Sequence, residues 1–413
     1  MSALIIAGLL MLHQGDATAV TPDWPQWGGP GRDFTSPNGR LADSWPESGP
    51  RPLWSRTLGE GHSAIAVESA KLYTMSSRGE EETVTALDAA TGKTIWEHRY
   101  PAPTAGMDYA LGKGPNSTPL VVGDRVFTVG ALGMLHALDK RTGSVRWSHD
   151  LWKEFGGTKI DNGYSCSPLA YRDTVIVTLG GKGKGVMAFR QQDGSLVWKG
   201  QDFENSPSSP ILIRVDGQDQ LVVFMAKEIA GLDPTCGALL WRQPHETKWD
   251  LNVSTPVWGA SNLLFCSSAY NGGSRMLQLR RAGGKTTVRE LWFSRRVRVH
   301  FGNVVRVGDL LCASSGDFGA TQITGVDVRS GKIFWQTRFP KATLVWGDRK
   351  LILLGEDGTL ALATASADGL QIRSKAKVLT AKAWTVPSLA GGVLYLRDRQ
   401  KIMALDLRME QRG

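Results

Sequence analysis

Two histidines and a set of amides, hydroxyls and carboxylates are the side chains of this sequence that could do chemistry. His62 and His300 carry the imidazole that serves as a general base or as a metal ligand. Asp161 and Asp250 could hold a cation together with nearby amide oxygens. A polar lining that binds water and adjacent strands is the other interpretation of the histidines. The full candidate set for a ligand site is His62, Asn116, Asp161, Tyr164, Asn205, Asp250, Asn252, His300, Asn303 and Trp384.

Most of these residues precede short apolar runs that are typical of buried strands. Four of them stand a few residues before a Ser-Pro or Thr-Pro pair, which leads into the apolar run; the pairs are Thr118-Pro119, Ser167-Pro168, Ser209-Pro210 and Thr255-Pro256. If the apolar runs are inner strands around a central channel, the polar segments meet at one mouth and form a funnel. His62 and His300 would then face each other across that mouth.

No motif of a catalytic or metal site accompanies these residues, so we predict no catalytic residue and no metal site. The sequence contains no nucleophile elbow and no paired-histidine metal motif. The stretch 180–185 (GGKGKG) joins two predicted strands and opens no helix, so we interpret it as a hairpin turn. The four cysteines, Cys166, Cys236, Cys266 and Cys312, match no zinc or redox spacing. We interpret them as buried free thiols, with a disulfide as the alternative in an oxidising compartment.

A recurring pattern indicates which elements position the candidate residues. In five segments, such as TALDAATGKTIW (85–96), Gly follows four residues after an Asp position and Trp follows eight residues after it. Arg190 replaces the Asp once. The motif residues are Asp88, Gly92, Trp96, Asp139, Gly143, Trp147, Gly194, Trp198, Asp233, Gly237, Trp241, Asp327, Gly331 and Trp335, and Trp54 and Trp292 are isolated tryptophans of the same kind.

Each motif position has a physical role in a β-hairpin. The Asp side chain accepts hydrogen bonds from backbone N–H groups two or three residues later and so holds the turn. Gly supplies the positive φ that a bulged hairpin loop needs. Trp buries a large flat face against a neighbouring sheet, and its indole N–H is expected to bond a nearby carbonyl. A second hairpin precedes each motif, which gives four antiparallel strands in about 45 residues, the length of a propeller blade.

We therefore predict an all-β fold, an eight-bladed β-propeller of four-stranded antiparallel blades. The last blade, 384–408, has only three predicted strands, while 52–55 is an orphan Trp strand near the other end. We expect this N-terminal Trp strand to pair with the C-terminal blade, because ring closure removes exposed sheet edges. The predicted organisation is a signal peptide (1–19), an extended arm (20–51), the propeller (52–408) and a tail (409–413).

The Asp–Gly–Trp pattern resembles the PQQ-like repeat (pyrroloquinoline-quinone repeat). It is similar to the tryptophan-docking repeat of quinoprotein dehydrogenases and to the propeller lipoprotein of the outer-membrane β-barrel assembly machinery. The resemblance covers about residues 52–408 and is specific for the fold. The segment 24–39 (WPQWGGPGRDFTSPNG) resembles the leader of exported quinone-repeat proteins. Its prolines preclude a helix, so we expect an extended arm with Trp24 and Trp27 packed against the ring.

The resemblance to the dehydrogenases also implies a cofactor site that can be checked residue by residue. It implies a quinone stacked on a disulfide between adjacent cysteines, and a calcium ion held by a Glu, an Asn and an Asp. The sequence has no Cys-Cys pair, and we match none of the calcium ligands to a motif. The expected cofactor is therefore none, with PQQ and calcium left as unsupported alternatives.

The first residues and the charge bear on location and partners. The apolar run 3–12, followed by Ala17-Thr18-Ala19, matches a signal peptide and is too short to span a bilayer. We interpret the net charge of +9 as a scattered solvated surface. We expect an exported monomer, periplasmic or extracellular, with no nucleic-acid partner and no transmembrane segment after signal removal.

Three hypotheses for function follow. The leading one is a non-catalytic binding or scaffold module for a cell-envelope protein, in the setting of envelope or outer-membrane assembly. The second is an enzyme with its site in the funnel, either a PQQ- or metal-dependent oxidoreductase or a hydrolase. The third is a carbohydrate or polyanion binder. The fold alone does not choose among them, because function depends on sites.

Overall fold

The computed structural model describes residues 23–409 except 38, 106, 109, 111, 159 and 320. The predicted signal peptide and residues 410–413 of the predicted tail lie outside the described residues. Within this part of the chain, no helix combines the length and apolarity needed to cross a membrane.

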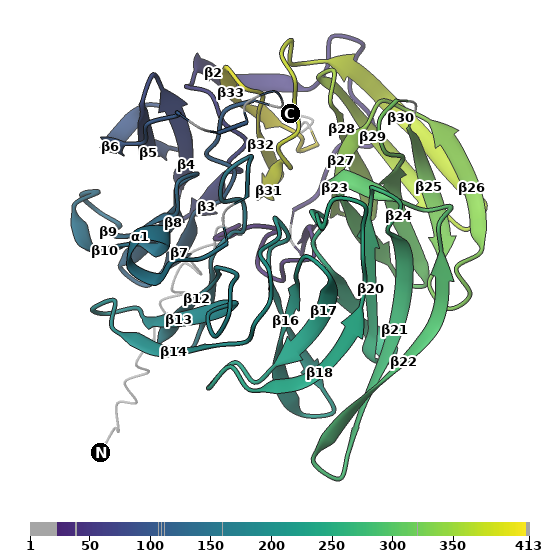
Figure 1. Cartoon of the computed structure of the whole chain (residues 1–413). Helices are drawn as coiled ribbons and strands as arrows, with labels where there is room; N and C mark the ends of the chain where they lie inside the picture. The colour runs from purple at the N-terminus through teal and green to yellow at the C-terminus, as the bar shows by residue number, and fades with distance from the viewer. Residues whose placement is uncertain are drawn as a thin grey trace, which may run out of the picture.

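Eight antiparallel sheets, each with four strands of its own blade, stand around a central axis and confirm the predicted propeller (Figure 1). The strands follow one another from the axis outward. Blade 1 consists of β3 (Ala66–Glu68), β4 (Lys71–Arg78), β5 (Glu81–Asp88) and β6 (Thr94–Pro101), and blade 2 of β7 (Leu120–Val122), β8 (Arg125–Val129), β9 (Met134–Asp139) and β10 (Val145–Asp150). Blade 3 consists of β11 (Leu169–Tyr171), β12 (Thr174–Thr178), β13 (Val186–Arg190) and β14 (Leu196–Gly200), and blade 4 of β15 (Ile211–Val215), β16 (Gln218–Phe224), β17 (Glu228–Leu232) and β18 (Leu239–Pro244). Blade 5 consists of β19 (Val257–Gly259), β20 (Leu263–Ser268), β21 (Gly273–Ala282) and β22 (Lys285–Ser294), and blade 6 of β23 (Val299–Val307), β24 (Leu310–Ser315), β25 (Gln322–Asp327) and β26 (Ile333–Arg338). Blade 7 consists of β27 (Ala342–Gly347), β28 (Lys350–Gly355), β29 (Thr359–Ser366) and β30 (Gly369–Lys377). Blade 8 consists of β31 (Ser388–Ala390), β32 (Val393–Arg397) and β33 (Lys401–Asp406), joined by β2 (Arg51–Thr57).

The eighth blade takes its outer strand from the other end of the chain. Strand β2 pairs antiparallel with β33, and Trp54 lies opposite Ala404. The helical elements are short: α1 (Leu151–Phe155) follows β10, and a 3-10 turn, Ala260–Asn262, separates β19 from β20.

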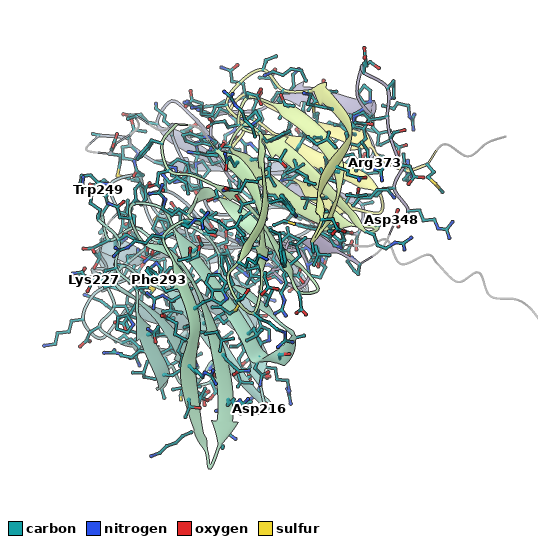
Figure 2. The ribbon with its side chains drawn as sticks, turned by 90° about the vertical axis from the view of Figure 1, so that its right-hand side faces the viewer. Asp216, Lys227, Trp249, Phe293, Asp348 and Arg373 are labelled. Carbon is teal, nitrogen blue, oxygen red and sulfur yellow. The ribbon has the colours of Figure 1, made fainter. Side chains whose placement is uncertain are left out.

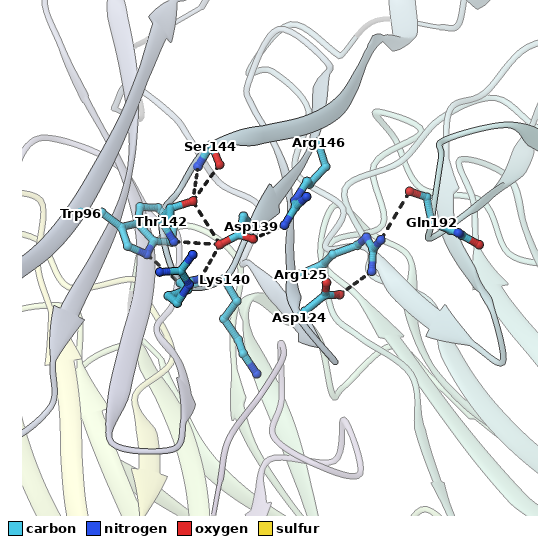
Figure 3. Close-up of polar contacts among 10 residues, drawn as sticks. Trp96, Asp124, Arg125, Asp139, Lys140, Thr142, Ser144, Arg146 and Gln192 are labelled. Atoms are coloured by element: carbon cyan, nitrogen blue, oxygen red, sulfur yellow. Dashed lines mark hydrogen bonds and ion pairs between the residues drawn. The ribbon is translucent and has the colours of Figure 1, made fainter.

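The motif tryptophans join neighbouring blades by one repeated hydrogen bond. The indole N–H of each donates to the carbonyl that directly follows the Asp position of the next blade, as in Trp96 Nε1 to the carbonyl of Lys140 at 3.0 Å (Figure 3). The same bond joins Trp54 to Ala89, Trp147 to Gln191, Trp198 to Pro234 and Trp292 to Val328. The motif Asp holds the turn that presents this carbonyl: Asp139 accepts from the N–H groups of Arg141 and Thr142, both at 2.9 Å.

Two tryptophans, Trp241 and Trp335, depart from this rule because the next blade lacks the Asp turn. Trp241 precedes blade 5, whose hairpin β21–β22 has ten-residue strands and turns at Gly283 and Gly284 without an Asp. No motif carbonyl stands where the indole could reach it, and Trp241 Nε1 donates to Gln220 Oε1 of its own blade at 2.7 Å. Trp335 faces blade 7, whose β29–β30 hairpin also lacks the motif, and its Nε1 donates to the carbonyl of Ser366 at the end of β29 at 2.7 Å.

The described part of the N-terminal arm lies across the ring and forms no helix (Figure 1), but residues 26–34 form turns and bends where an extended segment was expected. Trp24 is buried and exchanges backbone hydrogen bonds with Val67 of β3, both at 2.8 Å. Further along, the arm forms β1 (Thr35–Ser36), which lies parallel to β27 of blade 7. Between these two contacts Trp27 reaches Thr255 in the segment before blade 5, so the arm passes across the axis.

The close approach of glycine to tryptophan between blades gives a test of the docking contact. Gly143 (φ +74°) and Gly123 (φ +57°) both have left-handed backbone, but a Cβ on Gly143 would lie 2.4 Å from the Trp96 ring, whereas a Cβ on Gly123 would meet nothing within 4 Å. Both Gly→Ala variants share the backbone cost, so we expect G143A to lower the free energy of unfolding by about 1–3 kcal/mol more than G123A, through overpacking. Chemical denaturation measures this difference, and equal losses in the two variants would show that the ring contact is not tight.

Candidate functional site

The segments that lead into the inner strands are tied together by Ser and Thr hydroxyls. The N–H of Ala64 donates to Thr118 Oγ1 at 3.1 Å, that of Thr118 to Ser167 Oγ at 3.0 Å, and that of Ser167 to Ser209 Oγ at 2.9 Å. Three of the four Ser/Thr-Pro pairs therefore form a hydrogen-bonded belt across blades 1 to 4. Their hydroxyls hold the ring, because each satisfies a buried backbone N–H of the preceding blade.

The arm closes one end of the channel below this belt. Trp27 Nε1 donates to Thr255 Oγ1 at 2.8 Å, which uses the hydroxyl of the fourth pair. The buried Arg32 guanidinium donates to the carbonyls of Ser167 (3.1 Å) and Pro168 (2.9 Å). Burial lowers the pKa of Arg32 to about 10, which still leaves it cationic at neutral pH. The channel is thus a blind funnel with Trp27 at its floor.

The funnel encloses about 1010 Å³, counting space that is open to solvent at its mouth. Its walls are of two kinds. Aromatic and apolar residues on the wall are His62, Leu251, Val253, Tyr270, Phe301 and Trp384, and the polar residues are Asn116, Asn162, Ser165, Ser167, Ser209 and Thr385. The aromatic rings Trp384 and Phe301 come from the segments of blades 8 and 6, whereas Asn116, Asn162 and Ser165 come from those of blades 2 and 3.

The predicted pair of histidines does not face across the mouth. The His62 ring lies 5.4 Å from Trp384, Trp384 lies 4.7 Å from Phe301, and Phe301 stacks on His300 at 3.6 Å between ring centroids. The two imidazoles are therefore the ends of one aromatic stack on one wall. The prediction that the two histidines face each other across the mouth was wrong. His62 precedes blade 1 and His300 begins blade 6, so only blades 7 and 8 lie between them and both residues are on the same side of the ring.

Hydrogen bonds occupy both ring nitrogens of His300. Its Nε2 lies 2.6 Å from Tyr270 Oη, and its Nδ1 lies 2.9 Å from Lys341 Nζ. Because an ammonium group can only donate, Nδ1 is the acceptor and Nε2 carries the proton. Burial and the adjacent Lys341 charge lower the pKa of His300 to about 3. The residue is a neutral support behind Phe301, and neither nitrogen is left for a metal or a substrate proton.

The other predicted residues fall into three groups. His62, Asn116 and Trp384 line the funnel as expected. Tyr164, Asn205, Asn252 and Asn303 are buried away from it, and the last three hold loops and blades through backbone groups, as when Asn303 accepts from the N–H of Leu344 at 2.8 Å and donates to its carbonyl at 2.7 Å. Asp161 and Asp250 lie outward: Asp161 is exposed, and the Asp250 carboxylate lies 3.7 Å from Lys227 Nζ.

These corrections have a common cause. A residue that precedes an inner strand can turn its side chain to the axis, to the next blade or to solvent, and sequence spacing does not distinguish the three. Tyr164 is an example, because its ring fills the apolar core between blades 2 and 3. In the described chain no three His, Cys, Asp or Glu side chains come close enough together to hold a metal. All four cysteines are free thiols, and Cys236 is exposed where burial was expected.

Sequence reasoning missed several lining residues. Phe301 and Tyr270 line the funnel, and so do Asn162 and Ser165 on the polar side. Asn162 and Ser165 flank predicted candidates within the segment 161–169, so a signal was present. Trp27 carried no signal for the floor, because its place depends on where the arm crosses the ring.

Comparisons with known proteins agree with this architecture. The family profile described as outer membrane protein assembly factor BamB matches residues 38–123 and 80–337. An uncharacterised protein of Rickettsia conorii is 27% identical over 156 residues, which is 37% of this chain and only 34% of that relative's length.

Two solved structures show the same fold. BamB from Moraxella catarrhalis superposes with a TM-score of 0.59 at 17% identity, over 88% of this chain and 98% of that chain. The quinohemoprotein alcohol dehydrogenase of Comamonas testosteroni superposes with a TM-score of 0.51 at 13% identity, over 95% of this chain and 82% of that chain. At these identities the likeness concerns the fold alone.

The buried state of His300 can be tested by titration. With the pKa lowered to about 3, its imidazole should stay neutral at about pH 5, where an unperturbed histidine is mostly protonated. NMR spectra of protein labelled with ¹⁵N-histidine measure this, and the H300Q variant assigns the signal. Protonation of His300 near its ordinary pKa would contradict the proposed contacts with Tyr270 and Lys341.

Proposed function

The chain belongs to the PQQ-repeat β-propeller family of the outer membrane protein assembly factor BamB, and from this premise we propose that it is a non-catalytic binding module that docks an envelope protein on the rim of its funnel. The relation to an outer membrane protein assembly factor supports an envelope setting, and an exported location in the periplasm or outside the cell is part of the proposal. The observation that carries it is a patch of exposed aromatic side chains beside the mouth.

We define the aromatic rim as Lys248, Trp249 and Phe318; Tyr270, which is buried and lines the funnel, contacts both Lys248 and Phe318. Phe318 is 70% exposed and Trp249 is 58% exposed, the two highest values among the large apolar side chains of the described chain. The residues are contiguous: the Lys248 N–H donates to the Tyr270 carbonyl at 2.8 Å, and the Phe318 ring lies 6.0 Å from that of Tyr270. In Figure 2, Trp249 stands at one edge of the molecule, on the side opposite to Asp348.

The composition of the rim indicates what it would bind. Trp and Tyr dominate binding energy at protein interfaces, and exposed aromatic patches on soluble proteins mark interaction sites. Lys248 Nζ lies 4.8 Å from the Trp249 ring centroid and adds a positive charge beside the apolar surface. A partner segment that carries apolar side chains with a neighbouring carboxylate fits this pattern.

The quinone-enzyme alternative fits the residues of this chain poorly. PQQ is a tricarboxylate, but the funnel lining contains no Lys, Arg, Asp or Glu among the described residues. A buried carboxylate without a charged partner is strongly disfavoured. Adjacent cysteines are absent from the sequence, and no described carboxylate cluster is suited to calcium. We therefore propose a role without PQQ.

Photo-crosslinking tests the rim as a docking surface. A photoreactive residue in place of Lys248, in the protein expressed in its native host, should crosslink to an envelope protein. We expect the additional changes W249A and F318A to reduce the crosslinked product about tenfold or more, the loss that hot-spot residues produce. The matched control is F334A, which removes a ring 37% exposed on the outer strand β26. Undiminished product from the rim variants, or an equal loss with F334A, would exclude the rim as the site.

Absorbance spectroscopy tests the absence of quinone chemistry. We expect the protein purified from its native host to be colourless, and to remain so after incubation with PQQ and calcium followed by gel filtration. Stoichiometric uptake of the chromophore would overturn the non-catalytic role and place redox chemistry in the funnel.

A further inference from the structure

The funnel is a second feature that could bind, separate from the aromatic rim, and its two unlike walls define a ligand. On one wall the rings of Trp384 and Phe301 lie 4.7 Å apart and form a continuous apolar face. On the other wall stand Asn116, Asn162 and Ser165. A ligand that fills this space needs one apolar face and, opposite to it, groups that both donate and accept hydrogen bonds.

Charge restricts the ligand further. The described residues that line the funnel include no carboxylate, ammonium or guanidinium group. The charged groups nearest to the aromatic wall already have partners: Lys382 Nζ, 4.8 Å from the Trp384 ring, lies 3.9 Å from Glu356 Oε2, and Lys341 Nζ, 5.4 Å from the Phe301 ring, bonds to His300 Nδ1 and to the Asp317 carbonyl. A charged ligand would lose its hydration on entering the funnel without gaining an unpaired partner of opposite charge. A wholly apolar ligand would bury the amide groups of the polar wall unpaired, which is also unfavourable. The ligand must therefore be neutral and polar along one edge.

The polar wall has an atom ready for such an edge. Asn116 Nδ2 donates to the carbonyl of Asn162 at 3.1 Å and to Ser165 Oγ at 3.2 Å. These bonds fix the orientation of the amide and use its donor end within the protein. The Oδ1 atom is then the acceptor that remains for a ligand hydroxyl.

We propose that the funnel binds the terminal residue of a neutral carbohydrate. A hexopyranose ring has a face of C–H groups that packs on Trp384, and hydroxyl groups at its edge that reach Asn116 and its neighbours. The floor formed by Trp27, held by Thr255 Oγ1 at 2.8 Å, closes the funnel, so a glycan enters by its end and cannot pass through. The space of about 1010 Å³ includes solvent at the open mouth and therefore sets only an upper limit on the size of the ligand.

Saturation-transfer difference NMR with defined sugars tests this proposal. The probes are maltose, cellobiose and N,N′-diacetylchitobiose at millimolar concentration, together with α-cyclodextrin and glucuronic acid. We expect at least one neutral disaccharide to receive saturation, strongest on its terminal ring. We expect no transfer to α-cyclodextrin, which has glucose units but no chain end, or to the anionic sugar. Lack of transfer to all three disaccharides, or equal transfer to α-cyclodextrin, refutes the proposal.

Variants show whether the sugar binds in the funnel, and they separate a failure of this proposal from a failure of the proposed docking on the aromatic rim. We expect W384A and N116A each to weaken binding about tenfold or more, while W384F retains part of it because an aromatic face remains. The rim variant W249A should bind the sugar like the unchanged protein. Thermal unfolding of each variant checks that it is folded. Binding that survives in folded W384A and N116A, or that W249A abolishes, would place the sugar elsewhere.

Discussion

The whole ring depends on the bond between an indole N–H and a carbonyl of the next blade. Each blade is a small sheet whose two faces pack against the neighbouring blades. Its motif Trp packs at the outer part of one such contact, and the hydrogen bond of the indole N–H fixes the angle between the two blades. The Asp turn makes this possible, because it presents one carbonyl at the same place in each blade, as Lys140 does for Trp96 at 3.0 Å. Trp241 is the counterexample: the next blade has no such turn, and the Trp241 indole N–H bonds to Gln220 of its own blade instead.

The closure of the ring also shapes the funnel. The pairing of β2 with β33 joins the two ends of the described chain, and the arm that precedes β2 then has to cross the ring before it reaches that blade. In crossing, it places Trp27 and Arg32 at the bottom of the channel. A propeller without such an arm has an open axial channel, so the blind funnel is a product of where the N-terminal segment runs rather than of the blades.

The chemistry of the funnel follows from how the polar groups near it are satisfied. The Ser and Thr hydroxyls tie one blade to the next, Asn252 and Asn303 bond backbone groups, and both nitrogens of His300 are occupied. Buried polar groups in proteins are almost always paired, and here the pairing uses up most of the residues that looked reactive. What remains is a cavity whose described lining has an aromatic wall and an amide wall and no Asp, Glu, Lys or Arg.

The sequence by itself determined the all-β class, the number of blades and the tryptophan docking, because these depend on local offsets that repeat. Asp88, Gly92 and Trp96 can be recognised within one hairpin, and the same three positions recur around the ring. Its prolines also excluded a helix around Trp24 and Trp27, but the turns at 26–34 of the arm were not foreseen. Only the tertiary structure decided which side chains face the axis. Asn116 points into the funnel, whereas Asn252, at the similar place three blades later, bonds to the carbonyls of Met225 and Ala226. The choice depends on the backbone groups that each neighbouring blade leaves unpaired, and these become adjacent only when the ring closes.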